Sequence, residues 1–317
     1  MTCPCRVRVA FRTDKEPIMI KRIILTLLAA CFALPLGAEE VTQQFGDLTV
    51  NANLELAESS SLDDGVTLIV HGLQAHNRME IIEAIQKTLL QSGRSSLAIN
   101  LGLGIDNRRG FFDCSWPHRH GFDQAAAEIQ AWIDWLKQQG AGPISLIGHS
   151  FGGTQALVYL DRYRDSPVNR LILLAPATRH YDRLKSEYLA RYHKDLDTVL
   201  AQAQAMIDSG NGNQLMQNVD FFFCPRTRIS ASSFYDYYRR DGAFAHLPEY
   251  LRRAETPVLV IAGSNDERQP DVIRLLSPET DGRDKKLVVI ENAGHFFLDL
   301  NIEEAIEYAV AFIEDSG

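Results

Sequence analysis

Apolar and polar residues follow two different patterns along this chain, and each pattern predicts its own kind of strand. Apolar and polar side chains alternate over residues 48–56, which predicts a half-buried, antiparallel strand at a sheet edge. Further along, continuous apolar runs predict strands that are covered on both faces. These runs lie around residues 66–70, 96–101, 144–147, 170–175, 257–262 and 286–290.

Segments with helical periodicity separate the apolar runs. They lie at about residues 78–91, 123–138, 151–164, 269–276 and 302–314. Strands that alternate with helices in this way predict an α/β fold, in which a mostly parallel central sheet carries helices on both faces.

The alternation stops between Thr178 and Tyr250. This segment, residues 178–250, is predicted to be an inserted and mainly helical cap, with helical stretches near residues 182–208 and 232–240. Its aromatic side chains either line an apolar acyl pocket or pack the cap onto the rest of the domain. These aromatic residues are Phe221, Phe222, Phe223, Tyr235, Tyr237 and Tyr238.

The sequence Gly148-His149-Ser150-Phe151-Gly152-Gly153 joins a predicted strand to a predicted helix. A serine at the tip of such a turn adopts a strained backbone conformation, which the flanking glycines accommodate, and its hydroxyl points out above the sheet edge. The unpaired N–H groups at the helix start would face an oxyanion formed there. Ser150 is therefore the candidate nucleophile, although a small residue at a tight junction would produce the same pattern.

An acid and a base follow in the order serine, acid, histidine. Asp266 and His295 each come after an apolar run of strand length. Because the C-terminal ends of parallel strands open on one edge of a sheet, both side chains are predicted to converge there with Ser150. Glu267 and Asp271 are the nearest alternatives for the acid. Taken singly, Asp266 could cap a loop and His295 could begin a helix.

With these motifs the chain resembles the α/β-hydrolase superfamily, whose catalytic triad has the same order. The resemblance extends from about Phe45 to the C-terminus. It is specific at His71-Gly72-Leu73, at the serine turn, at Gly263 to Asp266 and at Gly294-His295. The ring of His71 itself is expected to brace its loop.

The resemblance implies a mechanism and a pocket. Ser150, Asp266 and His295 would form the triad, and the N–H groups of Leu73 and Phe151 would form the oxyanion hole. It implies no cofactor. The inserted cap would cover the active site and shape the pocket for a small-molecule ester or acyl substrate.

Residues 1–38 are predicted to be an N-terminal extension with an export signal that is removed. Lys21-Arg22 is a short basic region, residues 23–36 are apolar, and Leu36-Gly37-Ala38 offers a small-residue cleavage site. Met19 is an alternative start, and Leu28-Ala29-Ala30-Cys31 resembles a lipoprotein motif that would place a lipid anchor on Cys31. The apolar run is shorter than the ~20 residues of a membrane span. We therefore expect no membrane span and a periplasmic or secreted protein.

Charge narrows the possible partners. The net charge is −9, and without residues 1–38, which hold six basic and two acidic residues, it is −13. A negative surface repels phosphates, and no basic stripe with interleaved aromatic residues is present, so nucleic acid is excluded as a partner. Residues 39–317 suit a single α/β-hydrolase domain with one insertion.

Cysteine usage follows from the proposed cleavage. Removal of residues 1–38 leaves only Cys114 and Cys224. Such a pair in an oxidising compartment predicts a disulfide, which would tie the loop after residues 96–101 to the cap. Two free buried thiols are the ordinary alternative.

A second polar cluster lies near Cys114. Asp113 and His118-Arg119-His120 have the residue types of zinc ligands, but this loop rich in Gly, Pro and Arg does not suggest a fixed coordination geometry, and we expect no metal site. His118, Arg109 or Arg119 is expected either to contact the substrate or to belong to a solvated loop.

Together these observations predict a serine hydrolase that cleaves a carboxylic ester through an acyl-enzyme. A serine peptidase or a thioesterase of the same fold is the nearest alternative, because fold and triad do not encode the leaving group. An alternative of another class is a non-catalytic envelope protein that uses the hydrolase fold to bind a ligand.

Overall fold

The computed structural model describes residues 38–280 and 282–315. Residues 1–37, which contain Met19, Cys31 and almost all of the predicted export signal, lie outside the described residues. None of the helices in the described part combines the length and the apolar character that crossing a bilayer requires.

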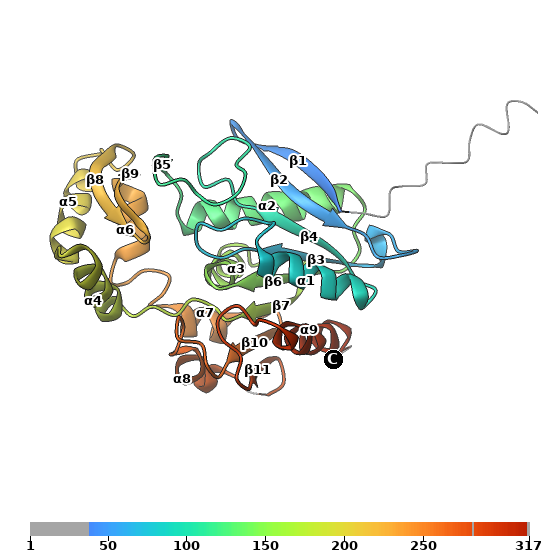
Figure 1. Ribbon diagram of the computed structural model, residues 1–317. Coiled ribbons are helices and arrows are strands. Elements are labelled where there is room, and N and C mark those ends of the chain that lie inside the picture. Colours follow the sequence, from blue (N-terminus) through green and yellow to red (C-terminus); the bar gives the residue numbers. More distant parts are fainter. Residues whose placement is uncertain (1–37, 281, 316–317) are drawn as a thin grey trace, which may run out of the picture. The chain divides into compact units, whose positions relative to one another are not determined.

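A mostly parallel sheet of eight strands forms the centre of the described chain (Figure 1). Its spatial order is β1-β2-β4-β3-β6-β7-β10-β11, and the six strands from β4 onward are parallel. The strands are β1 (Glu39–Phe45), β2 (Leu48–Glu55), β3 (Val66–Val70), β4 (Ser95–Asn100), β6 (Ile144–His149), β7 (Val168–Leu174), β10 (Val258–Gly263) and β11 (Lys285–Ile290).

The alternating segment forms β2, which is antiparallel to β4 as predicted. The predicted edge position is wrong, because β1 pairs with β2 in antiparallel register and takes the edge itself. The sequence patterns did not predict β1, because most of its residues are polar and exposed. An edge strand with one solvated face does not need a continuous apolar run.

Helices cover both faces of the sheet, which confirms the predicted fold class. α1 and α9 pack on one face, and α2 and α3 pack on the other. Each face has its own apolar cluster, with Trp132 of α2 buried in one and Ile82 of α1 buried in the other. These helices and the shorter α8 are α1 (Glu80–Gln91), α2 (Phe122–Gln138), α3 (Phe151–Arg162), α8 (Val272–Leu276) and α9 (Leu300–Glu314).

Residues 178–250 contain the predicted helices and also a β-hairpin that the sequence patterns did not reveal. Phe222 and Phe223 form the hairpin turn, and Phe222 has a φ of 48°. Glycine and asparagine usually take that conformation, so two phenylalanines gave no turn signal. The elements are α4 (Tyr181–Tyr192), α5 (Leu196–Asp208), β8 (Leu215–Phe221), β9 (Cys224–Ser230) and α6 (Ala231–Tyr238).

A disulfide between Cys114 and Cys224 joins the loop after β4 to this hairpin, with 5.2 Å between the two Cα atoms. Further contacts hold the same loop. The short strand β5 (Pro117–His118) pairs with β9, and the hydroxyl of Thr227 donates to the carbonyl oxygen of Cys114 over 2.7 Å. The cap hairpin is therefore attached to the body by covalent and non-covalent links at one place.

Reduction of this disulfide is expected to lower the free energy of unfolding by about 2–4 kcal/mol, because the bond closes a long loop in the unfolded chain. The contacts of β5 and Thr227 limit how far the cap opens, so hydrogen exchange should rise in β8 and β9 while β6 stays protected. Thiol titration of denatured, unreduced protein provides the control. Two titratable thiols in residues 38–317, or equal exchange before and after reduction, would contradict this prediction.

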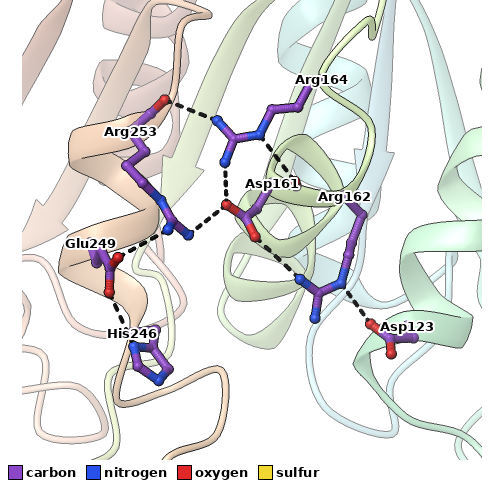
Figure 2. A network of polar contacts seen from close by, with 7 residues as sticks. All are labelled: Asp123, Asp161, Arg162, Arg164, His246, Glu249 and Arg253. Carbon is purple, nitrogen blue, oxygen red and sulfur yellow. Dashed lines mark hydrogen bonds and ion pairs between the residues drawn. The ribbon is translucent and has the colours of Figure 1, made fainter.

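Where the chain returns from the cap, α7 (Leu247–Arg253) is fastened to α3 by the ion-pair network of Figure 2. Asp161 of α3, whose side chain is only 10% exposed, pairs with Arg162, Arg164 and Arg253. Arg253 also pairs with Glu249 on its own helix. Because α3 carries the candidate nucleophile at its other end, this network anchors the cap segment to the helix that positions the site.

Candidate active site

Ser150 lies between the end of β6 and the first residue of α3, with φ 55° and ψ −119°. This positive φ is strained for a residue with a side chain. The close approach of neighbouring backbone explains the glycines, because a Cβ on Gly152 would overlap the carbonyl oxygen of Val70 and a Cβ on Gly148 would overlap that of Gly152. The tight packing holds the serine in place, as the motif predicted.

Three sheet-edge segments bring the predicted acid, base and nucleophile together. His295, in the loop after β11, has Nε2 3.0 Å from the Ser150 Oγ and Nδ1 2.8 Å from the Asp266 Oδ2. Asp266 lies in the loop after β10, and all three residues are at most 9% exposed. Asp271, the alternative acid, instead accepts a hydrogen bond from Arg274 and pairs with Arg183.

The second oxygen of Asp266 is held by backbone groups. Oδ1 accepts hydrogen bonds from the N–H groups of Arg268 and Gln269, both at 2.9 Å. Burial acts to raise the pKa of Asp266. The hydrogen bond to His295, the positive charge of a protonated His295 and these two N–H groups outweigh burial and hold the pKa below its ordinary value. The carboxylate is thus fixed in position and ionised, and it orients the His295 ring.

The His71-Gly72-Leu73 loop approaches Ser150 closely. A Cβ built on Gly72 would lie 3.3 Å from the Cβ of Ser150. Within the described chain, the N–H groups of Leu73 and Phe151 donate no hydrogen bond to protein, which leaves both available to an oxyanion. His71 braces this loop as expected. Burial lowers its pKa to about 3, and its neutral ring accepts from the Leu101 N–H at 3.1 Å.

A cavity of about 570 Å³ opens onto Ser150 and His295. Its apolar lining comes from both the body and the cap. Of the predicted cap aromatics, Phe223 lines this cavity, whereas Phe221, Tyr237 and Tyr238 are buried in contact with one another. The cavity volume lies within the range of small-molecule sites.

The loop around Cys114 contributes Phe111, Phe112 and Cys114 to this cavity, but Arg109, His118 and Arg119 of the same loop do not line it. Arg109 pairs with Glu40 at the edge strand, and Arg119 donates to the carbonyl oxygen of Asn213. His118 is 1% exposed and lies beside a separate cavity of about 10 Å³, so the prediction that it belongs to a solvated loop is wrong. Among the described residues, no group of three or more His, Cys, Asp or Glu side chains is placed to hold a metal ion.

The burial of His118 leads to a pH-dependent stability. Its two ring nitrogens have no hydrogen-bond partner in the described chain, and burial lowers its pKa to about 3. Below about pH 6.5 the folded state therefore binds fewer protons than the unfolded state. The free energy of unfolding decreases as the pH is lowered. The variant His118→Phe replaces the imidazole by an apolar ring between Phe112 and Phe221. We expect its free energy of unfolding to fall less steeply with decreasing pH, by about 1 kcal/mol per pH unit between about pH 5.5 and 4.

Urea unfolding of both proteins at several pH values measures this slope. The free energies of unfolding of the variant and the parent protein should differ least near about pH 7.5, where His118 is neutral in both the folded and the unfolded state. An unchanged slope in the variant would show that another group causes the acid sensitivity.

Sequence reasoning missed two features of the site. His149 donates from Nε2 to the backbone carbonyl of His295 over 3.0 Å, and burial lowers its pKa to about 3, so it positions the histidine loop as a neutral ring. In addition, four arginines line the cavity, and three of them come from the cap and the segment leading into it. No sequence pattern indicated this cluster, because Arg268 is far from Arg179, Arg183 and Arg191 in the chain.

The parallel sheet, the strand-serine-helix turn and the converging side chains define an α/β hydrolase. The chain belongs to the family described as serine aminopeptidase, S33, whose model matches residues 63–300. It is thus a member of a hydrolase family, and the resemblance stated from the motifs is confirmed. No curated protein matches the chain in sequence.

Solved structures share the fold at low sequence identity. One is Est1E from Butyrivibrio proteoclasticus with ferulic acid bound, at 19% identity and a TM-score of 0.60, covering 86% of this chain and 99% of that one. GrgF from Penicillium sp. sh18 has 17% identity and a TM-score of 0.62, with 88% and 98% covered. A monoacylglycerol lipase from Paleococcus ferrophilus has 19% identity and a TM-score of 0.55, with 82% and 96% covered.

Proposed function

We propose that this protein is an exported serine hydrolase that cleaves a carboxylic ester through an acyl-enzyme. The observation that carries the proposal is the continuous hydrogen-bonded series Asp266, His295 and Ser150, of which His295 and Ser150 line the cavity. A serine so placed beside a histidine and a fixed carboxylate is activated as a nucleophile.

In this mechanism, His295 Nε2 takes the proton of the Ser150 hydroxyl as the oxygen attacks the substrate carbonyl. The N–H groups of Leu73 and Phe151 stabilise the oxyanion, and Asp266 stabilises the imidazolium that forms. His295 then passes the proton to the leaving alcohol, and the acyl group stays on Ser150. Water, deprotonated by His295, releases the acid and restores the serine.

A serine aminopeptidase is the second candidate, because the matching family carries that description. An aminopeptidase must bind the positive ammonium group of its substrate. Glu187 and Glu267 are the carboxylates that line the cavity, and Glu187 already pairs with Arg179 and Arg183. An arginine-rich cavity repels an ammonium group, so the charge distribution favours an ester or thioester over an aminopeptidase substrate.

Export is proposed from the predicted signal in residues 1–38. The disulfide between Cys114 and Cys224 supports it, since disulfides persist mainly in oxidising compartments. A thioester of coenzyme A is a poor candidate in that setting. A non-catalytic envelope protein is the remaining alternative, and the complete Ser150, His295 and Asp266 arrangement argues against it.

The test is labelling of the purified protein with a fluorophosphonate, followed by turnover of aryl esters of increasing acyl length and of aminoacyl p-nitroanilides. We expect labelling at Ser150 and turnover of esters. Turnover of the anilides alone would favour the aminopeptidase, and neither labelling nor turnover would favour the binding protein.

A further inference from the structure

The cavity at Ser150 has a charge opposite to that of the whole chain. The chain carries a net charge of −9, yet in its described part four arginines and two glutamates line this cavity. The arginines are Arg179, Arg183, Arg191 and Arg268. A positive cavity in a negative protein attracts anionic ligands and focuses them on the site.

Two of these arginines form the inner part of the cluster and share one carboxylate. Glu187 pairs with Arg179 at 3.0 Å and with Arg183 at 2.7 Å. Arg183 NH1 also lies 3.8 Å from Asp271 Oδ2, beyond hydrogen-bond distance, and in the described chain the buried Arg179 Nε and Arg183 NH1 have no hydrogen-bond partner. Arg179 also lies 5.7 Å from the ring centroid of Phe151, the residue next to Ser150.

The other two arginines lie at the rim and are held against aromatic rings. The guanidinium of Arg191 lies 5.0 Å from the ring centroid of Phe223, and that of Arg268 lies 5.1 Å from that of Phe296. Arg191 and Arg268 are both exposed, and neither forms an ion pair with a carboxylate of the described chain. Stacking on a ring fixes a guanidinium and leaves its N–H groups free to bind oxygen atoms.

A backbone contact joins the two parts into one surface. Arg183 donates from its guanidinium to the backbone carbonyl of Arg268 over 2.9 Å, which connects the cap helix α4 to the loop that carries Asp266. We propose that this arginine cluster binds an anionic group of the substrate, a carboxylate or a phosphate, while the apolar lining binds the rest of the ester. This inference rests on the proposed ester hydrolysis and names its substrate class.

Planar guanidinium groups bind carboxylates and phosphates through paired hydrogen bonds, so both chemistries fit the cluster. The two sources differ in where the charge lies. An acid with a second, terminal carboxylate would carry it on the acyl part. A phosphorylated alcohol, such as a glycerol phosphate, would carry it on the leaving group.

Matched ester pairs separate these cases. The mono-p-nitrophenyl ester of adipic acid differs from p-nitrophenyl hexanoate only in that a carboxylate replaces the terminal methyl group. In the same way, 1-hexanoylglycerol 3-phosphate is the anionic partner of 1-hexanoylglycerol. We expect kcat/KM for one anionic ester to exceed that of its neutral partner by about tenfold or more, because hydrogen bonds to charged groups change binding by a factor of this size.

Substitution at the rim tests the residues. In the double variant Arg191→Gln/Arg268→Gln, the ratio of kcat/KM between the anionic and the neutral ester should fall towards one. Arg252→Gln is the matched control, since Arg252 is 63% exposed on α7 and does not line the cavity. It should leave the ratio unchanged. Added salt should lower the ratio in the parent protein.

Binding to the Ser150→Ala variant, measured by calorimetry with the same esters intact, separates this inference from the proposed function. Tighter binding of an anionic ester without turnover by the parent protein would support the anion site and contradict ester hydrolysis. Equal binding and equal turnover of both members of each pair would overturn the anion site and leave the hydrolase intact. A preference that survives in the double variant would also overturn it.

Discussion

Replacement of Ser150 by alanine is expected to abolish fluorophosphonate labelling and to lower ester turnover by about 10⁶-fold, as removal of a catalytic serine does in other enzymes. The reason is chemical, because within residues 38–280 and 282–315 no other side-chain oxygen is hydrogen-bonded to His295 Nε2. A residual rate of about 10³–10⁴-fold over water can remain from the oxyanion hole and substrate binding.

The thermal midpoint of this variant should change by only a few degrees. Alanine keeps the positive φ and the packing of the turn, and the lost hydrogen bond to His295 contributes about 1 kcal/mol. Ser145→Ala is the matched control, since Ser145 is a buried serine on the same strand with its hydroxyl bonded to Asn169. Labelling of Ser150→Ala at the parental rate would mean that another residue is the nucleophile.

The substitution Asp266→Asn is expected to preserve the fold and to lower turnover by up to about 10⁴-fold, by analogy with other triads. The backbone N–H groups of Arg268 and Gln269 need an acceptor, so the amide oxygen of the variant would take that position. Its NH₂ group would then face His295 Nδ1 and require an unprotonated nitrogen there. The ring proton would move to Nε2, which could no longer accept the proton of Ser150.

Asp271→Asn provides the matched comparison, because Asp271 lies on the same loop and bonds to Arg274. We expect it to retain near-parental turnover. Pre-steady-state kinetics would show which step is slowed, and acylation should be affected first. A larger loss in Asp271→Asn than in Asp266→Asn would move the role of the acid to Asp271.

Sequence patterns were sufficient for the body of the fold. Buried parallel strands must be apolar on both faces, so each of the six runs identified a strand directly, and the order of strands and helices then determined the fold class. The positions of Ser150, Asp266 and His295 were also predictable, because parallel strands place their C-terminal ends at one edge. The glycine-rich turn added a local constraint that few other residues satisfy.

The patterns failed where contacts between distant residues decide the structure. β1 is polar and gains its place by pairing with β2, and the hairpin turn at Phe222 is held by burial rather than by turn chemistry. His118 has the residue type of a ligand or catalyst, yet packing against Phe112 and Phe221 makes it a buried neutral ring.

The sequence by itself determined the strands, the helices and the three residues at the sheet edge, since local periodicity and turn geometry depend on neighbouring residues. The tertiary structure alone decided the charge of the cavity. Arg179 and Arg191 come from the cap segment and Arg268 from the loop after β10, and only packing of α4 on that loop places them around Ser150. Spatial clustering of charge has no period along a chain, so it emerges only when the chain is folded.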